Sequence, residues 1–151
     1  MRRQDREISR EEAVEVLQQG EYGVLSMCTP ANEAYGVPIN YALYQDNIYF
    51  HCAKEGSKLE YLSKNNRVSF CVVGATTVLP SKFGTLYESV IVSGSTLETE
   101  GTEKREALKQ FIEKYSGDYI REGKEYIDKL FDRVCVIKLT VESVTGKARK
   151  L

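Results

Sequence analysis

The sequence predicts an antiparallel β-barrel flanked by helices, in a single domain over residues 1–151. First, about six strand-like runs and about four helical pieces follow one another along the chain. Second, two central runs are joined by the short turn Gln45-Asp-Asn, which is typical of an antiparallel hairpin. Third, the strands are not separated by one crossover helix each, and this disfavours a doubly wound parallel sheet.

The first half of the chain is predicted to contain one helix followed by three strands. Ser9-Arg-Glu-Glu12 has the form of a capping box, in which the side chains of the first and fourth residues satisfy each other's backbone amides. It predicts a helix from about Ser9 to Gln19 that ends at Gly20. Apolar, partly alternating runs then predict strands over Tyr22–Cys28, Gly36–Tyr44 and Ile48–Ala53, the last two forming the hairpin.

The second half mixes helices and strands. Ser57-Lys-Leu-Glu60 repeats the capping-box pattern and predicts a short helix to about Lys64. Apolar residues at helical spacing predict two more helices, around residues 102–115 and 126–131. Residues 74–86 have no clear period and are predicted to form a long loop, which in a small domain is more often functional than accidental. The remaining strands are expected over Arg67–Val73, Tyr87–Leu97 and Arg133–Val141.

Charge and hydropathy exclude two classes of partner. The chain has 21 Lys plus Arg and 22 Asp plus Glu, a formal net charge of −1, whereas nucleic-acid binders usually carry a basic excess. No window approaches the roughly 20 apolar residues that a membrane-spanning helix needs. The first residues, Met1-Arg-Arg-Gln-Asp-Arg-Glu, are charged and lack the apolar stretch of a signal peptide. We therefore expect a cytoplasmic protein that binds neither nucleic acid nor membrane.

The cysteines and the single histidine disfavour metal and hydrolase sites. The four cysteines are far apart, form no C-x-x-C pair and lie in or beside apolar runs, so they are interpreted as reduced, buried residues. His51 is the only histidine, so no cluster of imidazoles can bind a metal. A Ser-His-Asp relay would need His51, but no G-x-S-x-G motif is present. The cysteines are Cys28, Cys52, Cys71 and Cys135.

The strand, turn and helix over residues 48–60 form the candidate site. The first amides of a helix have no partner within it and carry partial positive charge. Because Gly56 permits close approach of the backbone and Lys58 adds a full charge, the turn is suited to a phosphate group. Two structural alternatives stay open: Ser57 and Glu60 cap each other, and His51 is a partly buried histidine without a function.

The ordered set of runs resembles the FMN-binding split barrels of the pyridoxamine 5′-phosphate oxidase-like family, and most closely their nitroimidazole-resistance branch. The resemblance covers about Ser9 to Lys147. It is carried by Tyr22-Gly-Val-Leu-Ser, Tyr35-Gly-Val-Pro-Ile-Asn-Tyr, Ile48-Tyr-Phe-His-Cys-Ala-Lys-Glu-Gly-Ser-Lys, Asn66-Arg-Val-Ser-Phe-Cys-Val-Val, Tyr87-Glu-Ser-Val-Ile-Val-Ser-Gly and Thr140-Val-Glu-Ser-Val-Thr-Gly-Lys.

This resemblance implies a six-stranded antiparallel split barrel with Greek-key connections, and a homodimer that binds FMN in clefts between the two barrels. Ser57 and Lys58 would hold the FMN phosphate. The flavin ring would lie along Ile39, Asn40 and Tyr41.

The same resemblance places His51, Cys52 and Ala53 in the cleft, with His51 nearest to the substrate as the catalytic residue. Three residues of the other subunit would complete the cofactor site. They are Phe83, Tyr87 and Ser89.

The expected function is FMN-dependent reduction of a small, electron-poor molecule such as a nitroimidazole, with His51 bonding the substrate or giving it a proton. True pyridoxamine phosphate oxidases carry basic residues on the strand that matches Val37–Leu43, and this chain has none there. A phosphorylated vitamin B6 substrate is therefore disfavoured. The alternatives are a flavin-binding module for storage or sensing, and a barrel that binds no flavin but serves as an interaction domain or binds haem through His51.

Overall fold

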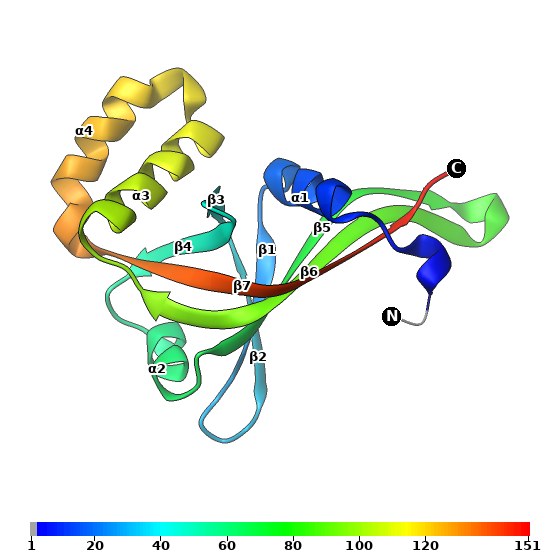
Figure 1. Cartoon of the computed structure of the whole chain (residues 1–151), viewed down its shortest axis with the longest axis horizontal. Coiled ribbons are helices and arrows are strands. Elements are labelled where there is room, and N and C mark those ends of the chain that lie inside the picture. Colours follow the sequence, from blue (N-terminus) through cyan, green and yellow to red (C-terminus); the bar gives the residue numbers. More distant parts are fainter. Residues whose placement is uncertain (1–2) are drawn as a thin grey trace.

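The structure, a computed structural model that describes residues 3–151, is built around one antiparallel sheet with helices beside it (Figure 1). The strands are β1 (Gly23–Cys28), β2 (Ala34–Ile39), β3 (Ala42–Tyr44), β4 (Asn47–Ala53), β5 (Arg67–Leu79), β6 (Gly84–Glu98) and β7 (Val134–Arg149). The helices are α1 (Arg10–Gln19), α2 (Ser57–Lys64), α3 (Gly101–Tyr115) and α4 (Ile120–Leu130). The order of strands in the sheet is β2-β1-β5-β6-β7-β4-β3.

The predicted antiparallel fold with flanking helices is confirmed, but the predicted number of six strands is wrong, because residues 3–151 form seven. The predicted strand Gly36–Tyr44 is two strands, and Asn40 and Tyr41 separate them. β2 pairs with β1, whereas β3 pairs with β4. Since β2 and β3 are the two outermost strands, this short segment connects opposite edges of the sheet and closes it into a split barrel.

Side chains replace the missing ladder bonds at the break between β2 and β3. The hydroxyl of Tyr115, on α3, accepts a hydrogen bond from the amide of Tyr41 at 3.1 Å. It also lies within donating distance of the carbonyl oxygens of Glu21 (2.6 Å) and Tyr41 (2.9 Å). The Tyr41 side chain is fully buried, and its own hydroxyl donates to the carbonyl of Leu17 at 2.6 Å. The break is therefore a fixed joint that ties α1 and α3 to the barrel.

The predicted loop over residues 74–86 is wrong, because β5 and β6 continue through it as a paired arm that projects from the barrel (Figure 1). A register shift between Val73 and Thr76 interrupts the alternation of apolar residues, and most side chains of the arm are at least partly exposed. Because of these two features, the sequence of the arm lacks the alternation of apolar and polar residues by which a strand is predicted. The last strand likewise runs to Arg149 instead of Val141, past another register shift at Ser93 and Gly94 of β6.

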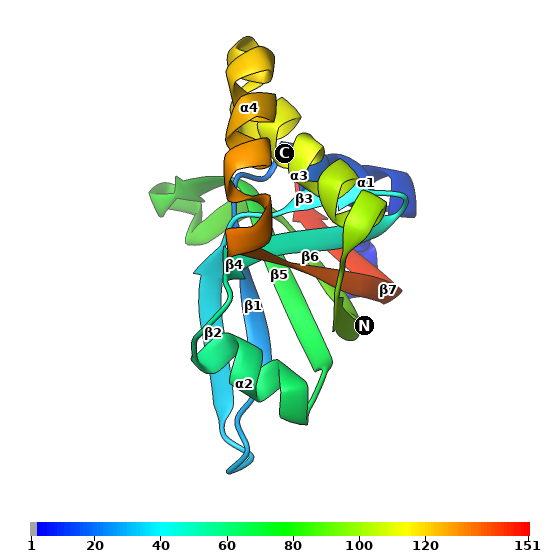
Figure 2. The ribbon, with the colours of Figure 1, turned by 90° about the vertical axis from the view of Figure 1, so that its left-hand side faces the viewer.

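Apolar residues form two cores, one on each face of β4. Ile48 and Phe50 point into the barrel, where they pack with Leu25, Phe70 and other buried residues. Tyr49 points to the other side, into a second cluster that contains Ala107, Leu108 and Phe111 of α3, Ile127 of α4 and Val136 of β7. In Figure 2, α3 and α4 lie at the end of the sheet next to β3 and β4. A strand that is buried on both faces anchors the helices to the barrel.

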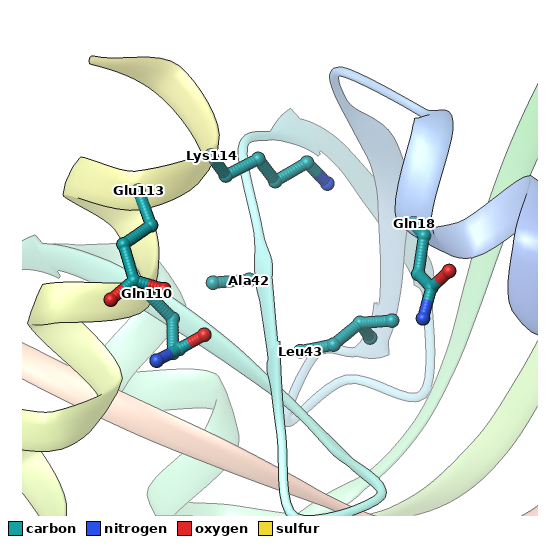
Figure 3. Close-up of a pocket in the computed structure, with 6 residues that line it drawn as sticks. All are labelled: Gln18, Ala42, Leu43, Gln110, Glu113 and Lys114. Atoms are coloured by element: carbon teal, nitrogen blue, oxygen red, sulfur yellow. The ribbon is translucent and has the colours of Figure 1, made fainter. Parts of the chain in front are cut away.

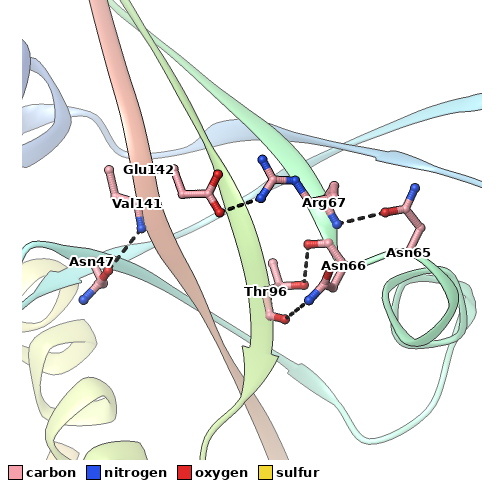
Figure 4. A network of polar contacts seen from close by, with 7 residues as sticks. All are labelled: Asn47, Asn65, Asn66, Arg67, Thr96, Val141 and Glu142. Carbon is pink, nitrogen blue, oxygen red and sulfur yellow. Dashed lines mark hydrogen bonds and ion pairs between the residues drawn. The ribbon is translucent and has the colours of Figure 1, made fainter.

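Polar contacts fix the connections around β5, β6 and β7 (Figure 4). Asn66, before β5, exchanges hydrogen bonds with Thr96 of β6. The Asn66 side-chain amide donates to the Thr96 backbone carbonyl, and the Asn66 backbone carbonyl accepts from the Thr96 hydroxyl. Arg67 pairs with Glu142 of β7. The Asn47 side chain accepts from the Val141 amide at 3.1 Å and so joins β4 to the middle of β7. None of the helices within residues 3–151 is long and apolar enough to cross a membrane.

Replacing Tyr115 by Phe tests the joint. The substitution keeps the ring but leaves the Tyr41 amide without its partner and the Glu21 carbonyl with the Asn40 side chain alone, so the free energy of unfolding should fall by about 1–3 kcal/mol. Urea denaturation measures this change. Tyr119→Phe is the control, because its hydroxyl makes no hydrogen bond within residues 3–151 and its side chain is exposed. Equal stability of the two variants would contradict the assigned role.

Candidate functional site

The end of β4 and the start of α2 carry five of the predicted site residues, namely His51, Cys52, Ala53, Ser57 and Lys58. His51, Cys52 and Ala53 pair with Val136, Cys135 and Val134 of β7. Because side chains alternate along a strand, His51 lies on the same face as Tyr49, towards α3 and α4, but it stays exposed where Tyr49 is fully buried. Cys52 lies on the opposite face and packs against the barrel core. His51 and Cys52 are neighbours in the sequence, but the His51 side chain faces the helices and the Cys52 side chain faces the barrel core.

His51 borders an apolar pocket of about 170 Å³ between α3 and α4. Its ring meets the ring of Phe111 edge to face, with 4.6 Å between the ring centroids. Partial burial, and secondly the positive charge of Lys58, lower the pKa of His51 below its usual value. The imidazole is therefore neutral near pH 7. The other residues that line the pocket are Leu108, Ile112, Tyr126, Ile127, Leu130 and Val134.

Sequence reasoning did not find the pocket residues on α3 and α4. Leu108, Phe111 and Ile127 belong to apolar stripes at helical spacing, and such a stripe is the ordinary signature of a helix packed on a core. Only the tertiary fold shows that these stripes also border His51. No pattern in the sequence distinguishes a helix face that only packs on the core from one that also borders His51.

The start of α2 differs from the predicted capping box. Gly56, with φ of +132°, is the N-cap residue, and no side chain of the described residues caps the helix. The first helical bond runs from the Glu60 amide to the Gly56 carbonyl, so the amides of Ser57, Lys58 and Leu59 precede it. In α1, by contrast, Ser9 and Glu12 make both bonds of the predicted box. The structural alternative for Ser57 and Glu60 is therefore wrong.

A phosphate group fits the uncapped start of α2. It offers three amide donors at the positive end of the helix dipole, together with the Ser57 hydroxyl and the Lys58 ammonium group. No atom lies within 4 Å of the position where a side chain of Gly56 would begin, so the approach is open. The charge of Lys58 also lowers the pKa of both His51 and Cys52, which places the cation near the end of β4. For Cys52, burial is the larger effect and raises the pKa overall.

The other predicted cofactor residues divide between the joint and the arm. Ile39 ends β2 and packs partly on the barrel core, and Asn40 is exposed, its amide donating to the Glu21 carbonyl at 2.9 Å. The Tyr41 side chain is fully buried, so it has no surface to offer a ligand. Phe83, Tyr87 and Ser89 lie on the β5–β6 arm, which projects away from β4 of the same chain (Figure 1).

The arm residues differ in exposure. Phe83, at the tip, is 98% exposed, and the Tyr87 hydroxyl accepts a hydrogen bond from Arg6 at 3.4 Å. Ser89 is half-buried opposite Val73 and Lys147. One chain by itself does not bring these three residues to His51.

The cysteines are free thiols, as predicted, but only Cys135 is buried. Burial raises the pKa of Cys135 to about 12, and it also raises the pKa of Cys71. Such thiols are weak nucleophiles at neutral pH. Within residues 3–151, no group of three or more His, Cys, Asp or Glu side chains could hold a metal ion.

A family model described as pyridoxamine 5′-phosphate oxidase matches residues 9–148. The chain belongs to the pyridoxamine 5′-phosphate oxidase family. No curated protein matches the sequence.

Solved structures share the fold of this family member. A candidate 5-nitroimidazole antibiotic resistance protein from Bacteroides thetaiotaomicron is 26% identical, with a TM-score of 0.81 over 93% of this chain and 85% of the other. A FAD-binding protein from Mesorhizobium loti is 23% identical, with a TM-score of 0.70 over 96% and 98%. A FAD and haem binding protein from Mycobacterium smegmatis is 15% identical, with a TM-score of 0.83 over 95% and 72%.

The single histidine permits a direct test of the site's electrostatics. In an NMR titration, the ring protons of His51 should show a midpoint below 6.5. Lys58→Met should raise this midpoint only in part, because burial is the larger cause of the lowered pKa. The folded protein then binds this proton at lower pH than the unfolded chain, so the contribution of His51 to stability is lost as the pH falls below about 6.5.

Lys64→Met, at the other end of α2, is the matched control and should leave the midpoint unchanged. A wild-type midpoint above 6.5, or an equal response to both variants, would show that the surroundings of His51 are assigned incorrectly.

Proposed function

We propose that this protein binds FMN and reduces small, electron-poor molecules such as nitroimidazoles and other nitroaromatics. The observation that carries the proposal is the uncapped, lysine-bearing start of α2 beside the only histidine. Membership of the family and the fold shared with a candidate nitroimidazole resistance protein support it. Bound FMN would supply the transfer of electrons and hydride.

The phosphate end of the cofactor would bind at the start of α2. The amides of residues 57–59 and the Ser57 hydroxyl donate to its oxygens, and Lys58 balances its charge. Since Lys58 lies near the end of β4, a nucleotide held there has His51 within its reach. Ile39, Asn40, Cys52 and Ala53 are the proposed surroundings of the ring, and for Tyr41 only the backbone is available.

His51 would orient the substrate. A neutral imidazole carries one N–H donor, and it can give this hydrogen bond to a nitro oxygen without first losing a charge. The apolar pocket around Phe111 excludes water on one side of the His51 ring and suits a small, uncharged substrate. No Arg or Lys lies in Ala34–Tyr44, so a second phosphate, as in vitamin B6 phosphates, would lack a charged partner.

A homodimer is part of the proposal, and the outer face of the sheet supports it. Two neighbouring rows of side chains cross β1, β5, β6 and β7 without a single charge, and Val24 and Ile91 are 39% and 46% exposed. Such an uncharged face suits burial against a second copy. The partner's arm would then be free to bring Phe83, Tyr87 and Ser89 to the cofactor. The rows are Val24, Cys71, Ile91 and Thr145, and Ser26, Ser69, Ser93 and Ser143.

A flavin- or haem-binding protein without turnover is the second candidate. Apart from His51 and Tyr126, the residues that line the apolar pocket are not titratable, so few groups there can assist proton transfer. A neutral, partly exposed histidine is also what an axial haem ligand requires. The protein from Mycobacterium smegmatis, which shares the fold, binds both FAD and haem.

FMN titration followed by flavin fluorescence tests the binding site. Lys58→Met should weaken FMN binding about tenfold to a hundredfold, because a hydrogen bond to a charged group contributes about 1.5–3 kcal/mol. Lys64→Met, in the last turn of the same helix, should bind FMN as the wild type does. If Lys58→Met leaves the affinity unchanged, the phosphate does not bind at α2.

The reaction is tested on the FMN-loaded protein under anaerobic conditions. After chemical reduction of the flavin, addition of a nitroimidazole should restore the oxidised spectrum faster than buffer does, and His51→Ala should slow this step. A yellow protein whose reoxidation is no faster than in buffer would favour storage or sensing. A Soret band on addition of haem that His51→Ala abolishes would favour haem binding.

Sedimentation velocity tests the dimer. The wild type should sediment as a dimer, and Ile91→Arg should shift it to the monomer, because it places a charge in the centre of the uncharged face. Leu97→Arg, on the same strand and similarly exposed, lies outside the two rows and should remain dimeric. A monomeric wild type at micromolar concentration would contradict the proposed assembly.

A further inference from the structure

A second cavity, separate from the His51 pocket, lies between α1, β3 and α3. Its volume is about 350 Å³. Figure 3 shows Lys114 of α3 extending its amine across the cavity towards the Gln18 side, while Gln110 and Glu113 lie on the opposite side. Ala42 and Leu43 of β3 complete the lining.

The amine of Lys114 is the unusual feature of this cavity. Its nitrogen is buried and has no hydrogen-bond partner within residues 3–151. It lies 3.7 Å from the centre of the Tyr41 ring and 5.4 Å from that of Tyr115, so two aromatic faces are its nearest favourable surroundings. Burial lowers the pKa of Lys114 to about 8, so most of the amine is still charged at pH 7.

Aromatic faces do not satisfy an ammonium group completely. An ammonium group has three N–H donors, and buried donors in proteins are nearly always paired. Glu113, the acid next to it in the sequence, makes no ion pair with Lys114 within the described chain, and Figure 3 shows its carboxylate beside Gln110. A ligand with a hydrogen-bond acceptor could bind the N–H groups of Lys114 that have no partner within residues 3–151.

An apolar cavity of about 250 Å³ lies next to the first one, and Gln18 and Leu43 line both. Its two ionic lining residues, Arg10 and Asp46, carry opposite charges. The apolar lining residues are Val14, Leu17, Leu43, Ile48, Val141 and Val144.

We propose that the two neighbouring cavities together bind an apolar monocarboxylate, such as a medium-chain fatty acid. Its carboxylate accepts from the Lys114 amine, on the side of the cavity where the Gln18 side chain lies. Its apolar chain passes over Leu43 into the second cavity, where it loses contact with water. We expect a ligand with a single negative charge, because Lys114 is the one cation that lines the first cavity and the carboxylate of Glu113 would repel a second charge.

This site is independent of the proposed FMN site. Its lining residues include none of those that border His51 and none from Gly56–Lys58. Either proposal can therefore fail without the other.

Isothermal titration calorimetry with sodium octanoate tests the site in the whole chain. We expect saturable binding that Lys114→Gln weakens at least about tenfold and that Lys114→Arg, which keeps the charge, restores to within about threefold. Lys109→Gln, on the same helix but at the surface, is the matched control and should bind as the wild type does. Thermal unfolding of each variant confirms that it is folded.

Ligands compared on the wild type test the chemical class without any substitution. Octanol lacks the charge and butyrate lacks most of the apolar chain, so each should bind at least about tenfold more weakly than octanoate. No saturable binding of octanoate below about 10 mM, or an affinity that Lys114→Gln leaves unchanged, would overturn the proposal. Inorganic phosphate binding more tightly than octanoate would also overturn it.

Discussion

The connection between β2 and β3 is the constraint on which the rest of the molecule depends. It carries the chain from one edge of the sheet to the other, and Tyr115 of α3 supplies the hydrogen bonds that the broken ladder lacks. Phe111, Lys114 and Tyr115 lie on one face of α3, since helical residues three and four apart are neighbours. Tyr115 at the joint therefore also fixes Phe111 against His51 and Lys114 over Tyr41. One helix face sets both the closure of the barrel and the surroundings of two candidate sites.

The alternation of side chains along β4 separates the chemistry of the site from the core. Phe50 and Cys52 serve the barrel, whereas Tyr49 and His51 face the helices. The strand then ends at Ala53, and the chain turns through Gly56 into the uncapped start of α2. A cation and a set of free amides thereby lie near a histidine that is itself kept neutral. No single residue of this unit is specific, and its meaning comes from the order strand, turn and helix.

The sequence predicted what local chemistry controls and missed what distant pairing controls. Ser9 and Glu12 formed the predicted box, but the identical spacing at Ser57 and Glu60 did not, because Gly56 took the cap position instead. The apolar alternation from Val37 to Leu43 continues through the break, so nothing in it reveals that the two halves pair with different strands. The unit from His51 to Lys58 was predictable because it is contiguous. The residues that α3 and α4 add to it were not.

Burial of the Lys114 amine lowers the free energy of unfolding, because the charged group loses contact with water. Its pKa is about 8 in the folded protein and about 10.5 in the unfolded chain, so folding releases protons between these values and stability falls as the pH drops from about 10.5 to about 8. Below that range the full cost remains, and it is present at neutral pH. A methionine would fill similar space over Tyr41 without the charge. The buried ammonium group is therefore not explained by packing alone, whereas an acceptor bound in the cavity would offset its desolvation.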